Sequence, residues 1–136
     1  MFVRNRKFAT LALLSCEVGR NGKTAGMDSD EQLYQVSCSG CHGSDARGNG
    51  PASPFINVPA PDLTRIAARR GGTFPADEIY RIIDGQSDLL PSGVRHMPVW
   101  GYEFFDAEED DQVAHQQAIG NVQRHVSYLR SLQRSE

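Results

Sequence analysis

Residues 38–42 read Cys-Ser-Gly-Cys-His, and this short stretch decides how the rest of the chain is interpreted. The pattern C-x-x-C-H is the attachment sequence of c-type haem. Two thiols one helical turn apart can each bond to one vinyl group of a porphyrin, and the adjacent imidazole can then reach the iron. We therefore expect Cys38 and Cys41 to hold a haem covalently and His42 to be an axial ligand of its iron.

Two other kinds of site use a C-x-x-C pair, namely a redox-active dithiol and one half of a zinc site. A dithiol does not need a histidine directly after its second cysteine. A Cys-rich zinc site needs a second pair of ligands, and the chain has only 3 cysteines. The sequence therefore favours haem over both alternatives.

Met97 is the candidate for the second axial ligand, because a thioether is a soft donor that favours ferrous iron and raises the reduction potential. It lies in the sequence His96-Met97-Pro98-Val99-Trp100-Gly101, where proline and glycine predict an irregular loop. Met1 and Met27 precede the predicted domain. The alternatives are His96 as the ligand, and a role for Met97 in filling the core.

The two motifs together resemble those of the monohaem class I cytochrome c family, especially bacterial members with a C-H-G segment and a later M-P-x-W-G. Here these are Cys41-His42-Gly43 and Met97-Pro98-Val99-Trp100-Gly101. The resemblance covers roughly residues 30–133. It implies an all-α fold, with short helices wrapped around one covalently bound haem c, and it implies electron transfer.

The resemblance also implies neighbours for the haem. In the family a proline carbonyl accepts a hydrogen bond from the proximal histidine, which orients the imidazole and makes it more basic. Pro51 is predicted for this role, with Pro54 second. Trp100 would either shield the haem or donate its indole N–H to a propionate, and the alternative is simple core packing.

Apolar spacing and end signals predict the helices. We expect them at residues 30–37, at 64–70 before Gly71-Gly72, at 78–84 before Gly85, and from about Gln116 toward the C-terminus.

The resemblance implies that the first and last helices cross, with Tyr34 meeting Tyr128 and Leu129. Asp30 stands where the family often has glycine at this crossing. His115 and His125 are expected at the surface or partly packed.

The composition of 136 residues, 39% of them hydrophobic, supports one domain, and the net charge of −3 makes nucleic acid a poor partner. Residues 1–15 resemble a secretory signal, with Leu13-Leu14-Ser15-Cys16 like a lipoprotein processing box. We predict a lipid on Cys16, and the alternative is an ordinary signal peptide that is cleaved elsewhere. A flexible linker is expected over residues 16–29 and the cytochrome domain over 30–136.

The predicted function is to carry single electrons between exported redox proteins, in the periplasm and anchored to a membrane through Cys16. The partners expected are a respiratory complex, a terminal oxidase or a dehydrogenase. Two alternatives keep the haem. One is the electron-accepting subunit of a periplasmic dehydrogenase, and the other is a sensor or enzyme with an open iron site.

Overall fold

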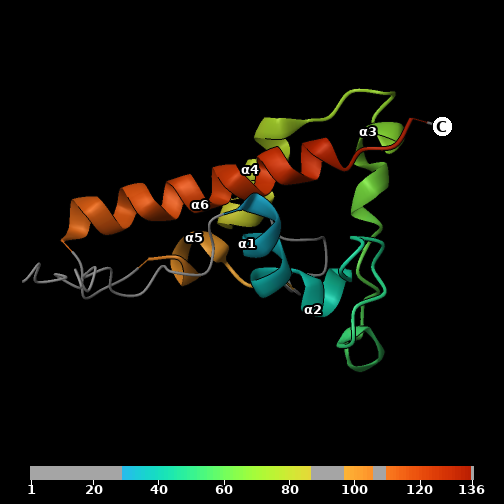
Figure 1. The fold of residues 1–136 in the computed structure, drawn as a ribbon, viewed down its shortest axis with the longest axis horizontal. Coiled ribbons are helices and arrows are strands. Elements are labelled where there is room, and N and C mark those ends of the chain that lie inside the picture. Colours follow the sequence, from blue (N-terminus) through green and yellow to red (C-terminus); the bar gives the residue numbers. More distant parts are fainter. Residues whose placement is uncertain (1–28, 87–96, 106–109, 136) are drawn as a thin grey trace, which may run out of the picture.

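The computed structural model describes residues 29–86, 97–105 and 110–135. The predicted signal sequence, Cys16, the linker up to residue 28 and the rival ligand His96 lie outside these residues. The described parts consist of helices and connecting loops, with no strand (Figure 1). None of their helices is both long enough and apolar enough to cross a membrane.

The first helix, α1, spans Asp30–Ser37 as predicted, because its start is fixed by local signals. The Ser29 hydroxyl accepts a hydrogen bond from the Gln32 N–H, and the Gln32 side chain accepts one from the Ser29 N–H, each at 3.1 Å. This reciprocal capping box satisfies two backbone donors at the helix end. Asp30 and Glu31 in the first turn favour the positive end of the helix dipole. A short helix, α2, follows at Ser39–His42.

The last helix, α6, is the longest and spans Asp111–Ser131. It begins earlier than the predicted Gln116, because the Asp110 side chain caps it by accepting from the Gln112 N–H at 3.0 Å. In Figure 1, α6 crosses the whole molecule, with α1 and α5 beneath it. It contacts α1, α4 and α5, so it forms the spine of the fold.

The crossing of α1 and α6 is as the resemblance implied. The rings of Tyr34 and Tyr128 lie with their centroids 5.2 Å apart, and Tyr34 and Leu129 are both buried. Asp30, in place of the family's glycine, accepts a hydrogen bond from Arg124 Nε at 2.8 Å. An ion pair between Asp30 and Arg124 therefore joins the two helices at this point.

Between the first and last helices the chain forms short elements. These are the 3₁₀ turns η1 (Ser53–Phe55) and η2 (Leu63–Arg65), and the helices α3 (Ile66–Arg69), α4 (Ala76–Asp84) and α5 (Trp100–Glu103).

Two differences from the expected elements stand out. The helix predicted over residues 64–70 is divided into η2 and α3 by Arg65, whose backbone is not helical. Gly101 belongs to α5, whereas the sequence predicted an irregular loop. The loop is thus shorter than expected, because Val99 caps a helical turn that begins only three residues after Met97.

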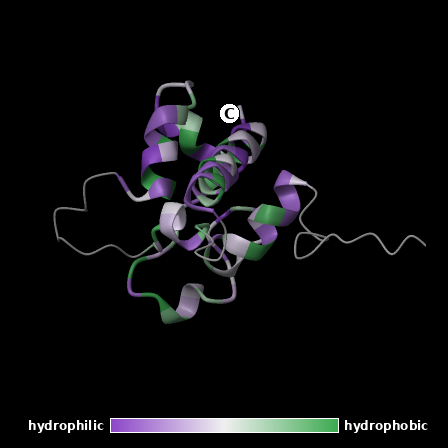
Figure 2. Ribbon diagram, turned by 90° about the vertical axis from the view of Figure 1, so that its left-hand side faces the viewer, coloured by the Kyte–Doolittle hydropathy of each residue, from purple (hydrophilic) through white to green (hydrophobic). Residues whose placement is uncertain are grey.

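The prediction for His125 was wrong. Its side chain is 1% exposed in α6 and lies at the crossing with α1, whereas His115 is exposed. His125 belongs to the apolar stripe of α6, three residues after Val122 and four before Leu129, and all three are buried. Figure 2, which looks along α6, shows hydrophobic and hydrophilic residues alternating along the helices, as expected where each helix buries one face.

Candidate functional site

The C-x-x-C-H stretch continues almost directly from α1. The Cys38 N–H donates to the Tyr34 carbonyl at 2.8 Å, and the His42 N–H donates to the Cys38 carbonyl at 2.9 Å. Cys38, Cys41 and His42 therefore lie on one turn of helix that is rooted in α1. This is the arrangement that the motif requires, with two thiols on one turn and the imidazole beside the second.

The chain after His42 folds back on α2 and pairs with its backbone. The N–H groups of Gly50 and Ala52 donate to the carbonyls of Cys41 and Gly40, at 3.1 and 2.9 Å. The Ser53 hydroxyl also donates to the Cys41 carbonyl, at 3.0 Å. These bonds satisfy the carbonyls at the end of a helix too short to satisfy them itself.

Gly50 is required at this contact. A Cβ atom there would lie 2.4 Å from the Gly40 carbonyl oxygen and 2.6 Å from that of Ser39. Both atoms belong to the backbone and cannot turn away. The close approach of the loop to α2 therefore depends on a residue without a side chain.

A buried tyrosine fixes the turn that follows His42. The Tyr34 hydroxyl donates to the Gly43 carbonyl at 2.8 Å, and Tyr34 is 0% exposed. Burial is the main cause that raises the pKa of Tyr34, with the nearby Cys38 thiol adding to it, so this hydroxyl stays protonated and remains a donor. The sequence singled out Tyr34 only for its ring, and the hydroxyl carries a second role.

Both thiols are free and half-buried. Burial, with a smaller effect from Cys41, raises the pKa of Cys38 to about 12. A redox-active dithiol needs the opposite, because thiolate is the reactive form and such sites lower the pKa. In the part of the chain that the structure describes, no cluster of three or more His, Cys, Asp or Glu side chains could hold a metal ion. The dithiol and zinc alternatives therefore find no support.

His42 is partly buried, and burial lowers the pKa of its imidazole, which keeps the ring neutral and able to ligate iron. The backbone of Pro61 acts against burial and raises the pKa of His42. Since proline has no N–H, the group that acts on the ring is the Pro61 carbonyl. The Nδ1 atom is buried and has no partner with full hydrogen-bond geometry among the described residues. The contact from Pro61 is therefore a close one that falls short of a standard hydrogen bond.

The proline carbonyl that acts on His42 is therefore that of Pro61, whereas Pro51 was predicted, with Pro54 second. All three prolines are exposed, so exposure does not distinguish them. The sequence analysis did not consider Pro61 for this role.

Met97 is partly buried and packs on the main hydrophobic cluster, which Cys38 and Trp100 also contact. Cys38 and Met97, far apart in sequence, therefore adjoin the same core. Trp100 stacks on Phe104 with ring centroids 5.3 Å apart, so core packing accounts for at least one of its faces.

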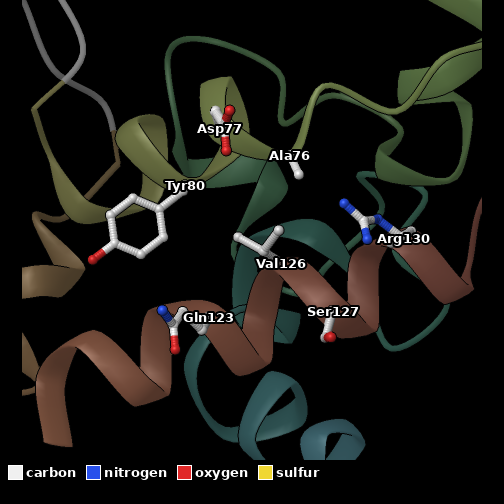
Figure 3. A pocket seen from close by; sticks show the side chains of 7 residues that line it. All are labelled: Ala76, Asp77, Tyr80, Gln123, Val126, Ser127 and Arg130. Carbon is white, nitrogen blue, oxygen red and sulfur yellow. The ribbon is translucent and has the colours of Figure 1, made fainter. Parts of the chain in front are cut away.

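A groove of about 200 Å³ between α4 and α6 lies elsewhere (Figure 3). Its lining comes from Ala76, Asp77, Tyr80, Gln123, Val126, Ser127 and Arg130. None of the predicted site residues contributes to it.

The helical fold and the cysteine–histidine turn define a class I-like monohaem c-type cytochrome domain. The chain belongs to the family described as cytochrome C oxidase, cbb3-type, subunit III, because the family's sequence model matches residues 25–115. No curated protein and no solved structure matches the chain significantly.

Membership of this family means that the chain binds one haem c covalently and transfers electrons through its iron. The residues present fit that group. Two free thiols lie on one helical turn, a neutral imidazole follows them, and a thioether reaches the same core cluster. Cys38 and Cys41 would form the thioether bonds, and His42 and Met97 would be the axial ligands.

Proposed function

We propose that this protein is an exported one-electron carrier that delivers electrons to a membrane-bound respiratory complex, with a terminal oxidase as the preferred partner. The observation that carries the proposal is the meeting of Met97 with the core that Cys38 contacts. An imidazole and a thioether would occupy both axial positions of the iron, which leaves none for a substrate. A site of this kind exchanges electrons without binding another molecule.

When bound, the haem supplies an iron that alternates between the ferric and ferrous states by one electron. The protein's part is to keep the surroundings of that iron unchanged between the two states. Tyr34 and the loop that folds back on α2 hold the turn at His42 in place. The partly buried Met97, as a soft donor in apolar surroundings, would favour the ferrous form and raise the potential.

The family description supports an oxidase as partner, since it names a subunit of a cytochrome oxidase. The leader-like residues 1–15 and the processing box before Cys16 support export and lipid anchoring. A lipid on Cys16 would confine the search for a membrane-bound partner to the membrane surface.

The function is tested with the full chain matured in a host that attaches haem c. Protein reduced beforehand is added to bacterial membranes that contain a haem–copper terminal oxidase, and oxygen uptake is measured. The proposal predicts oxygen uptake that depends on the added protein. No uptake, together with copurification of a larger catalytic dehydrogenase chain, would favour the dehydrogenase subunit instead.

The anchor is tested separately by fractionating cells. Cys16→Ser should move the protein from the membrane to the soluble fraction. Ser15→Ala, which keeps the cysteine and a small residue before it, is the matched control and should leave the protein with the membrane. If both variants fractionate like the wild type, Cys16 carries no lipid.

A further inference from the structure

The segment from Gly48 to Pro61, GNGPASPFINVPAP, contains no Asp, Glu, Lys or Arg, although charged residues make up 23% of the chain. Residues 36–44, which include α2, also lack these four residue types. Between the two segments stand Asp45 and Arg47, which pair with each other at 3.6 Å. The region around the cysteines therefore carries no unpaired formal charge from residue 36 to residue 61.

The two uncharged segments form one continuous region. The Ala52 N–H donates to the Gly40 carbonyl at 2.9 Å, and η1 packs against α2. In Figure 1 the loop that carries η1 runs beside α2 at the edge of the molecule. We call α2 together with residues 48–61 the uncharged face.

Large apolar side chains on this face are turned to water. Phe55 is 86% exposed and Val58 is 41% exposed, and nearby on α1 Val36 is 73% exposed. A phenylalanine contributes little to the stability of the fold when most of its side chain is exposed to solvent. A group of exposed apolar side chains marks an interaction site. The core does not account for Phe55.

We propose that the uncharged face is the docking surface for a redox partner, and that this partner presents an uncharged, apolar surface around its own redox centre. The proposal rests on the proposed electron-carrier function and specifies the chemistry of its partner. Electron transfer requires a partner to come close to the haem. Because the haem is attached through Cys38 and Cys41, that approach is made to α2 and the residues beside it.

The absence of charge decides what kind of partner fits. A charged group brought onto this face would lose its water and find no opposite charge to replace it, which is costly. An apolar surface pays no such penalty, and it gains from covering Phe55 and Val58. The net charge of −3 is carried by the rest of the molecule. Docking is therefore governed by apolar contact, and ionic strength acts on it only through the net charges of the two molecules.

A second copy of the protein is the available probe, because it is a haem protein that presents this same uncharged face. The rate of electron self-exchange is measured by NMR on mixtures of the ferric and ferrous protein. Two copies carry the same net charge of −3, so between about 10 mM and about 500 mM salt we expect the wild-type rate to rise as this repulsion is screened, and not to fall.

Phe55→Glu places one negative charge at the centre of the face, so two copies that meet there repel each other. We expect the self-exchange rate at low salt to fall by about tenfold or more and to recover partly as salt is added. Val113→Glu is the matched control, since Val113 is 45% exposed near the start of α6, far from α2 in Figure 1. It adds the same charge and should leave the rate unchanged.

Backbone amide shifts supply a readout that does not depend on electron transfer. As the concentration of the wild type rises, the amide signals of residue 55 and Val58 should move. In Phe55→Glu the signals of these two positions should stay fixed. Equal self-exchange rates for Phe55→Glu and Val113→Glu would overturn the docking proposal. So would a wild-type rate that falls as salt is added, because attraction between opposite charges would then hold the contact.

Failure of the proposed function is seen differently. Hexaammineruthenium(II), a small cationic reductant, should reduce both variants at least as fast as the wild type, because it needs no apolar contact and is attracted by an added negative charge. If it reduces none of them, electron transfer itself is in doubt. If it reduces all three while the Phe55→Glu result is negative, the carrier function stands and only the docking surface is wrong.

Discussion

The hydrogen bond from the Tyr34 hydroxyl to the Gly43 carbonyl can be tested by removing a single oxygen atom in Tyr34→Phe. The bond is 2.8 Å long and buried. The ring stays in place, so its tilted contact with Tyr128 is kept. The Gly43 carbonyl also accepts from the Ala46 N–H at 3.1 Å, so the substitution does not leave it without a partner.

The expected loss is therefore that of one ordinary intramolecular hydrogen bond, about 1 kcal/mol, and not the larger penalty of a stranded carbonyl. For a domain of about 100 residues this lowers the melting temperature by about 5 °C. The measurement is thermal unfolding of the haem-containing protein, followed by far-ultraviolet circular dichroism.

Tyr128→Phe is the matched control, because it makes the same change in the other ring of this aromatic pair. No hydrogen bond of the Tyr128 hydroxyl is found among the described residues, and its melting temperature should stay within about 2 °C of the wild type. A Tyr34→Phe variant with the same melting temperature as the wild type would show that this hydrogen bond does not stabilise the fold. A loss above about 3 kcal/mol would refute the reasoning too, since the Gly43 carbonyl would then lack its second donor.

Two further predictions concern a buried histidine and a close glycine contact. Burial lowers the pKa of His125, although the carbonyls of Asn121 and Leu33 and the charge of Asp30 act in the opposite direction. The unfolded chain therefore binds a proton at this histidine more readily than the folded protein does. The free energy of unfolding should fall as pH drops below about 6.5. Urea unfolding across this range should show a smaller fall for His125→Leu, and equal pH dependence would contradict the assignment. Gly50→Ala drives a Cβ into backbone and should greatly reduce the yield of haem-containing protein, measured by visible absorbance. Gly120→Ala, where a Cβ meets nothing within 4 Å, should keep the wild-type yield.

The all-α fold and the haem follow from short-range signals. The helix Asp30–Ser37 was predicted to the residue, because its cap and its acidic first turn lie within a few residues of each other. The C-x-x-C-H stretch is equally local, since one helical turn sets its geometry. The family match confirms the fold class and the cofactor that these signals predicted.

Features that depend on how a loop folds back were harder to predict. The sequence pattern pointed to Pro51 as the partner for His42, and only the folded path of the chain shows that the Pro61 carbonyl acts on the ring. The hydrogen bond from the Tyr34 hydroxyl to the Gly43 carbonyl also depends on how the chain turns after His42. These contacts join residues through a turn whose shape the sequence pattern does not specify.

The burial of His125 could have been predicted. The residue stands at helical spacing from Val122 and Leu129, both on the apolar stripe of α6. Its polarity argued for the surface, but a neutral imidazole can be buried when one nitrogen is satisfied locally. Here His125 Nδ1 lies 2.8 Å from the Asn121 carbonyl oxygen, one turn earlier in the same helix.

The proposed ligation of the haem iron by His42 and Met97 is tested by optical spectroscopy of the wild type beside Met97→Ala. The wild type should be low-spin, should show the weak long-wavelength band of iron–methionine ligation when oxidised, and should bind little carbon monoxide when reduced. Met97→Ala should lose the band and bind carbon monoxide readily. A wild type that is high-spin, lacks the band and binds carbon monoxide would show that Met97 is not a ligand and would favour a sensor or enzyme with an open iron site.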